Sequence, residues 1–328
     1  MRPHRIATLL LLVPLAVQAE DPPVLVRSFG RTGSTEGSME LPAGVAVDAN
    51  GNFYVAEEFG NRVQKFDSTG TSLAVLCGQG TEPGKVNGPK DLVIDRRQRL
   101  WVSDTANYRL QWFTLAGEFI GAFGDSTEFN QPFGIGLDPT GSFLFVADCA
   151  HHRIRKFDVT GDGPVLVADF GRHGADPGLL DRPLDVAISA TGEIHTVEWI
   201  NRVQIFSPTG EFEMSFGRPG SAPGQFDIPS GISVDGLGNI YVVDTINHRV
   251  QKFARNGAFI LQWGPSVDKL YRLRAPIRMT FAPGNLAIVC DHDPGFHSDR
   301  IAVYRMQAPT TAVESRSWTD VRRLYRGR

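Results

Sequence analysis

The sequence predicts an all-β fold, a six-bladed β-propeller made of four-stranded antiparallel blades. One pattern of short apolar strands and polar turns returns six times along the 328 residues. Its copies start 43 to 51 residues apart, which is the period of propeller blades rather than of helical solenoids. The copies open at Pro42, Pro89, Pro132, Pro183, Pro229 and Pro276. We expect one propeller domain over residues 20–304.

The first 19 residues have the features of a cleaved signal peptide. Arg2 and Arg5 are followed by the apolar run 6–17, and small residues lead up to Ala19. The run is too short to span a bilayer and contains a proline. We therefore expect export, with cleavage near Ala19 and a mature chain that is secreted, or periplasmic in a Gram-negative host.

The ends of the repeat region predict how the ring closes. Residues 24–29 resemble a fourth strand without the first three, and the last copy, residues 276–304, has three strands without a fourth. Pairing the two completes the sixth blade and removes free sheet edges. Deleting residues 24–29 should therefore be far more damaging than deleting the basic tail, residues 305–328.

Within each copy, the second strand leads through a polar corner to the third. An acid ends the second strand and an arginine opens the third, so the two can form a charge-assisted hydrogen bond across the corner. Because all six copies share this pair, we assign it to the blade itself. The Gly-rich connectors between blades follow no helix start, so we interpret them as turns rather than phosphate-binding loops. Function should lie where one blade departs from the others on exposed loops.

The pattern P-x-G-V-x-V-D, G-N-x-Y-V-x-D, N-x-R-V-Q-K-F resembles the NHL repeat and is sharpest at residues 42–66 and 229–253. The resemblance covers nearly all of the mature chain. It implies a six-bladed β-propeller whose inter-blade loops and corners share one face around a central channel. The uses of the family are diverse: protein or RNA binding, ligand sensing outside the cell, and zinc-dependent peptide amidation by a lyase.

The amidating branch places a histidine directly after the blade-opening proline in three blades. This sequence has no histidine there; the six residues are Ala43, Lys90, Phe133, Leu184, Ser230 and Ile277. The fold resembles that of the lyase, but its zinc histidines are missing.

Charge argues against nucleic acid as the main partner. The whole chain carries −3, but the signal segment and the tail are basic, which leaves −9 on residues 20–304. Binding to phosphates rests on a basic surface. The three cysteines, at 77, 149 and 290, allow at most one bridge, and we expect none.

Candidate binding residues are those that depart from the repeat on the loop face. Some are acids and aromatics of the corners, and others are charged residues that should ring the channel mouth. They are Glu57, Phe59, Lys90, Asp91, Tyr108, His152, Asp185, Trp199, His248 and Arg278. Such aromatics mark interfaces, but they also pack between blades, and the two aspartates could simply pair with Lys90 or Arg278.

Blade six has an enlarged corner that could hold a divalent metal, either zinc or calcium. Its candidate ligands are Asp291, His292, His297 and Asp299. Imidazole and carboxylate suit such ions, but the spacing matches no named motif. The alternative is a solvated polar loop whose turn is fixed by Asp291 and Asp299.

From these observations we expect a monomeric, exported propeller that binds a protein, peptide or carbohydrate through its loop face. The rival is a metal-dependent hydrolase or lyase at the channel mouth. A third interpretation is a mainly structural component of the cell envelope. No transmembrane segment is expected.

Overall fold

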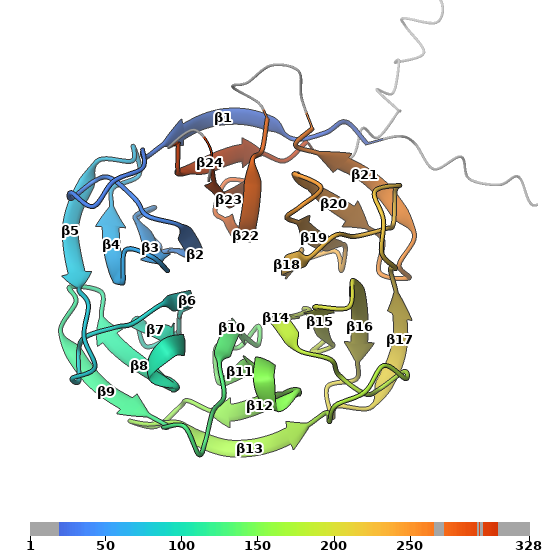
Figure 1. Cartoon of the computed structure of the whole chain (residues 1–328), viewed down its shortest axis with the longest axis horizontal. Helices are drawn as coiled ribbons and strands as arrows, with labels where there is room; N and C mark the ends of the chain where they lie inside the picture. The colour runs from blue at the N-terminus through green and yellow to red at the C-terminus, as the bar shows by residue number, and fades with distance from the viewer. Residues whose placement is uncertain (1–19, 266–271, 294, 296–297, 308–328) are drawn as a thin grey trace, which may run out of the picture.

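The fold is a ring of six four-stranded blades around a central channel (Figure 1). A computed structural model describes residues 20–265, 272–293, 295 and 298–307. In the part of the chain so described, no helix has the length and apolar character that a membrane span requires.

Each blade runs from an innermost first strand to an outermost fourth strand, and all neighbours are antiparallel. The first strands are β2 (Pro42–Val47), β6 (Pro89–Ile94), β10 (Pro132–Leu137), β14 (Pro183–Ile188), β18 (Pro229–Val234) and β22 (Ala275–Ala282). The second strands are β3 (Phe53–Glu57), β7 (Arg99–Asp104), β11 (Phe143–Asp148), β15 (Ile194–Glu198), β19 (Ile240–Asp244) and β23 (Leu286–His292). The third strands are β4 (Arg62–Phe66), β8 (Arg109–Thr114), β12 (Arg153–Asp158), β16 (Arg202–Phe206), β20 (Arg249–Phe253) and β24 (Arg300–Arg305). The fourth strands are β5 (Ser72–Cys77), β9 (Phe119–Phe123), β13 (Val165–Phe170), β17 (Phe212–Phe216), β21 (Phe259–Trp263) and β1 (Val24–Phe29).

The ring closes as predicted, because β1 pairs with β24 and becomes the outer strand of the sixth blade. Phe29 at the end of β1 then packs against Phe53 and Phe66 of the first blade, with ring centroids 5.1 and 5.4 Å apart. The first strand of the chain thus joins the last blade to the first.

Apolar cores fill the seams between neighbouring blades. One core joins Tyr54 and Val63 of the first blade to Leu92 and Phe113 of the second. Five further clusters of buried residues occupy the remaining seams of the described ring. Since alternate residues of a strand point to opposite faces of its sheet, each blade supplies side chains to two seams.

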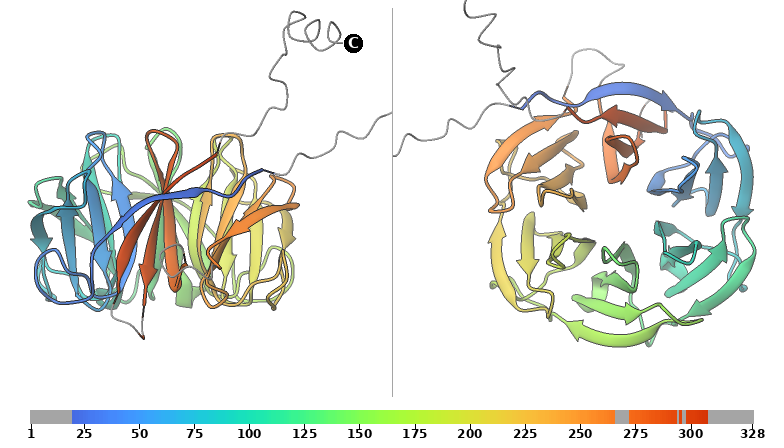
Figure 2. Two further views of the ribbon diagram at one scale, coloured as in Figure 1. Left: turned by 90° about the horizontal axis from the view of Figure 1, so that it is seen from above. Right: turned by 180° about the vertical axis from the view of Figure 1, so that it is seen from behind.

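The two faces of the ring carry different connections (Figure 2). On one face lie the connectors between blades and the corners between second and third strands; we call it the loop face. The opposite face carries the turns within the first and third hairpins of each blade; we call it the turn face. Two corners contain short 3-10 helices, η1 (Thr105–Asn107) and η2 (Cys149–His151).

Candidate functional site

Acid–arginine pairs fix the corners of the loop face, as the sequence predicts. The arginine Nε lies 2.7 to 3.0 Å from the carboxylate of the same corner in all six blades. The pairs are Glu57–Arg62, Asp104–Arg109, Asp148–Arg153, Glu198–Arg202, Asp244–Arg249 and Asp291–Arg300. Glu57 is fully buried in this role, so the acid that its corner presents at the surface is Glu58.

The same carboxylates tie each corner to the connector that enters its blade. In every blade, the residue two positions before the blade-opening proline donates its backbone N–H to the corner acid, at 2.7 to 2.8 Å. The loop face is therefore a rigid surface, because its loops are bonded to one another as well as to the strands.

Three charged residues meet inside the channel, from alternate blades. Arg278 of β22 forms ion pairs through Nη1 with Asp185 of β14 and with Asp91 of β6, the latter at 3.1 Å. Backbone N–H groups of Ile135 and Ile232 complete the site, each 2.9 Å from one of the two carboxylates. The sequence predicts these three residues at the channel mouth, and in the structure all three are buried. Of the two pairing partners considered for the aspartates, Lys90 and Arg278, the structure uses Arg278.

The alternation of blades has a steric reason. At the position of Asp91, Asp185 and Arg278, the other three blades have Gly44, Gly134 and Gly231. A Cβ on Gly134 would lie 2.1 Å from Asp185 Oδ1, and a Cβ on Gly44 would lie 2.7 Å from the Cα of Asp91. The glycines leave space for charged side chains that reach across from the neighbouring blades.

The electrostatics of this trio follow from its burial. Burial raises the pKa of Asp91 to about 7; Arg278 opposes the rise and Asp185 adds to it. Burial also raises the pKa of Asp185, against the favourable charge of Arg278. The common cause is the desolvation of two buried carboxylates that face a single guanidinium. The trio borders a channel cavity of 240 Å³.

Large apolar side chains are exposed at four corners of the loop face. Phe59 is 65% exposed, Ile246 47%, Trp199 41% and Tyr108 39%. They belong to the corners of the first, fifth, fourth and second blades respectively. The three aromatic residues named from the sequence, Phe59, Tyr108 and Trp199, are thus all exposed and none is buried between blades.

A charged contact lies beside these side chains. Lys90, directly after a blade-opening proline, forms an ion pair with Glu58 of the preceding corner. Its ammonium also lies 4.9 Å from the centre of the Phe133 ring. These half-buried side chains join the first three blades at the channel mouth.

His152 and His248 occupy one shared position, the last residue of a corner. Both have a positive φ, 55° and 58°. The backbone N–H of Arg182 donates to His152 Nδ1 at 3.1 Å. In the first and fourth blades, Asn61 and Asn201 accept the same kind of bond through Oδ1, at 2.8 Å. His152 therefore has a structural task in addition to any binding role.

In the enlarged corner of blade six, the described acids have structural partners. Asp291 accepts the backbone N–H groups of Arg274 and Ala275 and pairs with Arg300. Asp299 lies 2.6 Å from His292 Nδ1 and also accepts the backbone N–H of Leu41 in the first blade. His297, the fourth predicted ligand, lies outside the described residues. The metal prediction for this corner remains a prediction.

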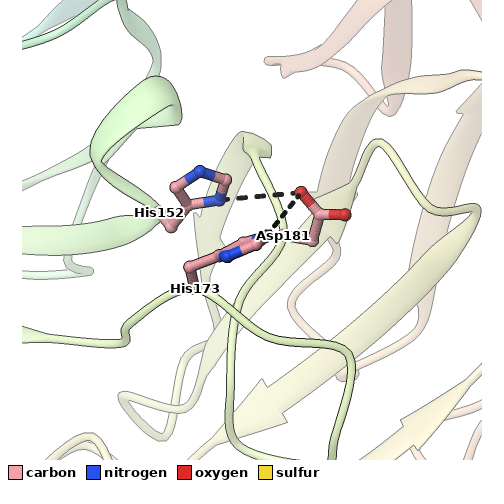
Figure 3. Close-up of side chains that lie close together, drawn as sticks. All are labelled: His152, His173 and Asp181. Carbon is pink, nitrogen blue, oxygen red and sulfur yellow. Dashed lines mark ion pairs between the residues drawn. The ribbon is translucent and has the colours of Figure 1, made fainter.

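Sequence reasoning missed a cluster at the seam between blades three and four, where His152 meets His173 and Asp181 (Figure 3). His173 and Asp181 belong to the connector between these blades, which the sequence analysis treated only as a turn. A signal was present: among the four bridged connectors, this one alone has a histidine at the bridge position. The bridge residues are Thr32, Gln79, His173 and Pro219.

The cysteines do not contribute to a site. Cys77, Cys149 and Cys290 are buried and unbridged. Burial raises the pKa of each thiol, so at neutral pH all three are packed as neutral groups.

Comparisons with known proteins agree with this architecture. The NHL repeat model matches residues 40–66 and 226–253. NHL repeat-containing protein 3 of Mus musculus is 32% identical over 120 residues, which are 35% of this chain and 35% of that protein. The chain thus spans about a third of that relative's length.

Two solved structures show the same fold. A Bacteroides thetaiotaomicron protein of unknown function has a TM-score of 0.66 at 15% identity, covering 85% of this chain and 74% of that one. Virginiamycin B lyase from Staphylococcus aureus has a TM-score of 0.57 at 15% identity, covering 86% and 88%. At this identity the likeness concerns the fold alone. The matches and the geometry together show a six-bladed β-propeller whose first and fifth blades match the NHL repeat.

Proposed function

We propose that the protein is an exported binding module that holds a protein, peptide or carbohydrate partner on its loop face. The observation that carries the proposal is the set of four exposed corner side chains, Phe59, Tyr108, Trp199 and Ile246. Large apolar groups at fixed positions on a rigid frame are the usual anchors of binding surfaces.

A protein or peptide is the partner class that this surface favours. NHL propellers mediate protein interactions. Bonded corners also keep the entropy cost of binding low, because the loops that carry the anchors already have their hydrogen bonds before the partner arrives. A carbohydrate would stack on the aromatics and leave Ile246 unused.

Export is proposed on the sequence of the first 19 residues. A basic start, an apolar run and small residues before position 20 are typical of a cleaved leader. N-terminal sequencing of the protein recovered from the cell exterior or periplasm should begin at Glu20. Recovery of the full-length chain from the cytoplasm would contradict export without affecting the binding proposal.

The binding test compares exposed apolar residues of the two faces. Chain 20–328 serves as bait for extracellular or envelope proteins, alongside the double variant Phe59→Ser, Trp199→Ser. The matched control is Leu237→Ser on the turn face, where the side chain is 78% exposed. We expect a stoichiometric partner that the parent and Leu237→Ser retain and the double variant loses at least tenfold. Equal capture by all three chains would exclude the loop face as the binding surface.

The alternative is an enzyme, a metal-dependent hydrolase or lyase at the channel mouth, with its metal ion bound in the blade-six corner. It requires a zinc or calcium ion that disappears on substituting His292 and His297. Metal analysis of the parent and of the variant His292→Ala, His297→Ala therefore decides between this alternative and a binding module without that ion.

A further inference from the structure

The four seams whose connector bridge is described bring together three equivalent positions on the loop face. The first is the last residue of a corner, occupied in chain order by Asn61, Tyr108, His152, Asn201, His248 and Asp299. The second is the bridge residue of the connector that follows the corner in the ring. It is Gln79 after Asn61, His173 after His152, Pro219 after Asn201 and Thr32 after Asp299. The third lies two residues before the blade-opening proline and is occupied by Glu40, Asn87, Asn130, Asp181, Asp227 and Arg274.

Among the four seams with a described bridge, only the seam between blades three and four has histidine or carboxylate at all three positions. His152 Nδ1 lies 3.6 Å and His173 Nε2 4.0 Å from the same oxygen, Asp181 Oδ1. One ligand atom from each residue lies within 4.8 Å of the other two. Figure 3 shows the two imidazole rings converging on the carboxylate from separate segments.

We propose that His152, His173 and Asp181 bind a divalent transition metal ion, for which zinc is the best fit. Zinc takes imidazole nitrogen and carboxylate oxygen at about 2.0–2.2 Å, and tetrahedral ligands around it lie about 3.4 Å apart. To reach that geometry, the separations between the three ligand atoms must shorten by between about 0.2 and about 1.4 Å. Two imidazoles favour zinc over calcium or magnesium, which prefer oxygen ligands.

The residue that must move is the one best able to do so. The His173 side chain is 70% exposed, whereas those of His152 and Asp181 are 22% and 19% exposed. Two ligands are therefore held by the fold and the third lies on the exposed connector. Three protein ligands leave a fourth position open to water or to a group from a partner, as in zinc sites that are not purely structural.

Without metal, His152 Nδ1 and Asp181 Oδ1 already have hydrogen-bond partners, and this determines how the site binds a metal ion. Arg182 donates its backbone N–H to His152 Nδ1, and its Nε lies 3.4 Å from Asp181 Oδ1. A metal at Nδ1 replaces that backbone bond and also meets the positive charge of Arg182. The chain therefore folds without metal and binds it reversibly, and removing the charge of Arg182 should strengthen binding.

The chain itself supplies variants that keep the seam intact. His152→Asn introduces the residue that blades one and four use at this corner position, where Asn61 and Asn201 keep the cross-seam hydrogen bond. Asp181→Asn and His173→Gln introduce the residues that stand at Asn87 and Gln79. Arg182→Gln introduces the residue of Gln131, which shares the positive φ of Arg182.

The experiment is a zinc titration of the untagged chain 20–328 after chelator treatment, by calorimetry and by competition with a chromophoric chelator. We expect one equivalent of zinc in the parent. His152→Asn, His173→Gln and Asp181→Asn should each weaken binding at least tenfold, and Arg182→Gln should tighten it. The control His248→Asn changes the same corner position in blade five and should leave the affinity unchanged.

Several outcomes would overturn the proposal. The proposal is wrong if the parent does not bind zinc, or if all three ligand variants bind it as tightly as the parent. It is also wrong if zinc is lost only when His292 and His297 are substituted. Thermal unfolding of each variant checks the fold, and the exposed position of His173 keeps His173→Gln informative if another variant is unstable. Absence of zinc binding would not contradict the proposed binding of a partner on the loop face, because that proposal does not depend on these three ligands.

Discussion

At the scale of single residues, the channel trio shows how charge is placed in a propeller core. Asp91, Asp185 and Arg278 come from alternate blades, and each reaches over a glycine of a neighbouring blade. Buried ion pairs seldom add net stability, because desolvation offsets the attraction. The trio links the first strands of three blades to one another and, through the N–H groups of Ile135 and Ile232, to those of the third and fifth blades.

The trio also predicts a pH dependence of stability. The folded-state pKa of Asp91 is about 7, whereas an unfolded chain has an aspartate pKa of about 3.9. Between these values the folded protein binds more protons than the unfolded chain, so its stability falls as pH rises, by at most about 1.4 kcal/mol per pH unit.

This dependence can be measured by urea unfolding of the parent and of Asp91→Asn between pH 4.5 and 8.5. The variant carries no titrating group at this position. The parent should therefore lose stability relative to it as pH rises, and the difference should level off above about pH 7. Parallel stability curves would show that Asp91 does not take up a proton on folding.

At the scale of elements, the corner is the unit that the chain repeats most faithfully. Arg249 shows why. Its Nε lies 2.7 Å from Asp244, and its Nη groups donate to backbone carbonyls of the preceding connector, including that of Gln225 at 2.9 Å. One side chain thus joins a second strand, a third strand and a connector, all at a buried site.

Replacing that arginine should be severe. Arg249→Met leaves Asp244 buried without its cation, and we expect a loss of about 3–5 kcal/mol in the free energy of unfolding. The control is Arg97→Met, whose partner Asp162 is fully exposed and whose ion pair should contribute about 0–1 kcal/mol. Urea unfolding at pH 7 measures both. Similar losses in the two variants would contradict the assignment of the corner arginine as a structural anchor.

Strand positions were largely predictable from local pattern, and short helical turns were not. The alternating run that ends at Phe253 forms β20 as expected. The helices η1 and η2 contain three residues each, too few for any periodicity to appear in the sequence.

At the scale of the whole molecule, closure through β1 is the main determinant of integrity. β1 supplies the outer strand of the last blade, and Phe29 packs into the core of the first. A chain that begins at residue 30 would expose the edge of β24 and leave that core incomplete. We expect it to lose cooperative unfolding and to aggregate.

The control for that experiment is a chain ending at Gln307, which keeps β24 and should unfold at the midpoint of the parent. Thermal unfolding followed by circular dichroism distinguishes the two truncations. If the chain from residue 30 unfolds like the parent, ring closure does not depend on the first strand.

The candidate site was only partly open to sequence reasoning. Phe59, Tyr108 and Trp199 could be named because they break a repeat whose other copies show what the blade needs. Glu57 was grouped with them, although it is the structural acid of its corner. His173 and Asp181 were missed, because the connectors were interpreted as turns and compared by their glycines rather than by the residue at the bridge position.

By itself, the sequence determined the six blades, their four-strand order, the closing strand and the shared corner chemistry. These depend on local periodicity and on a unit repeated six times, so each copy checks the others. The tertiary structure alone decided that Arg278 pairs with Asp91 and Asp185 across the channel and that His152, His173 and Asp181 meet at one seam. Those contacts depend on the radius of the closed ring and the path of its connectors, which no single repeat encodes.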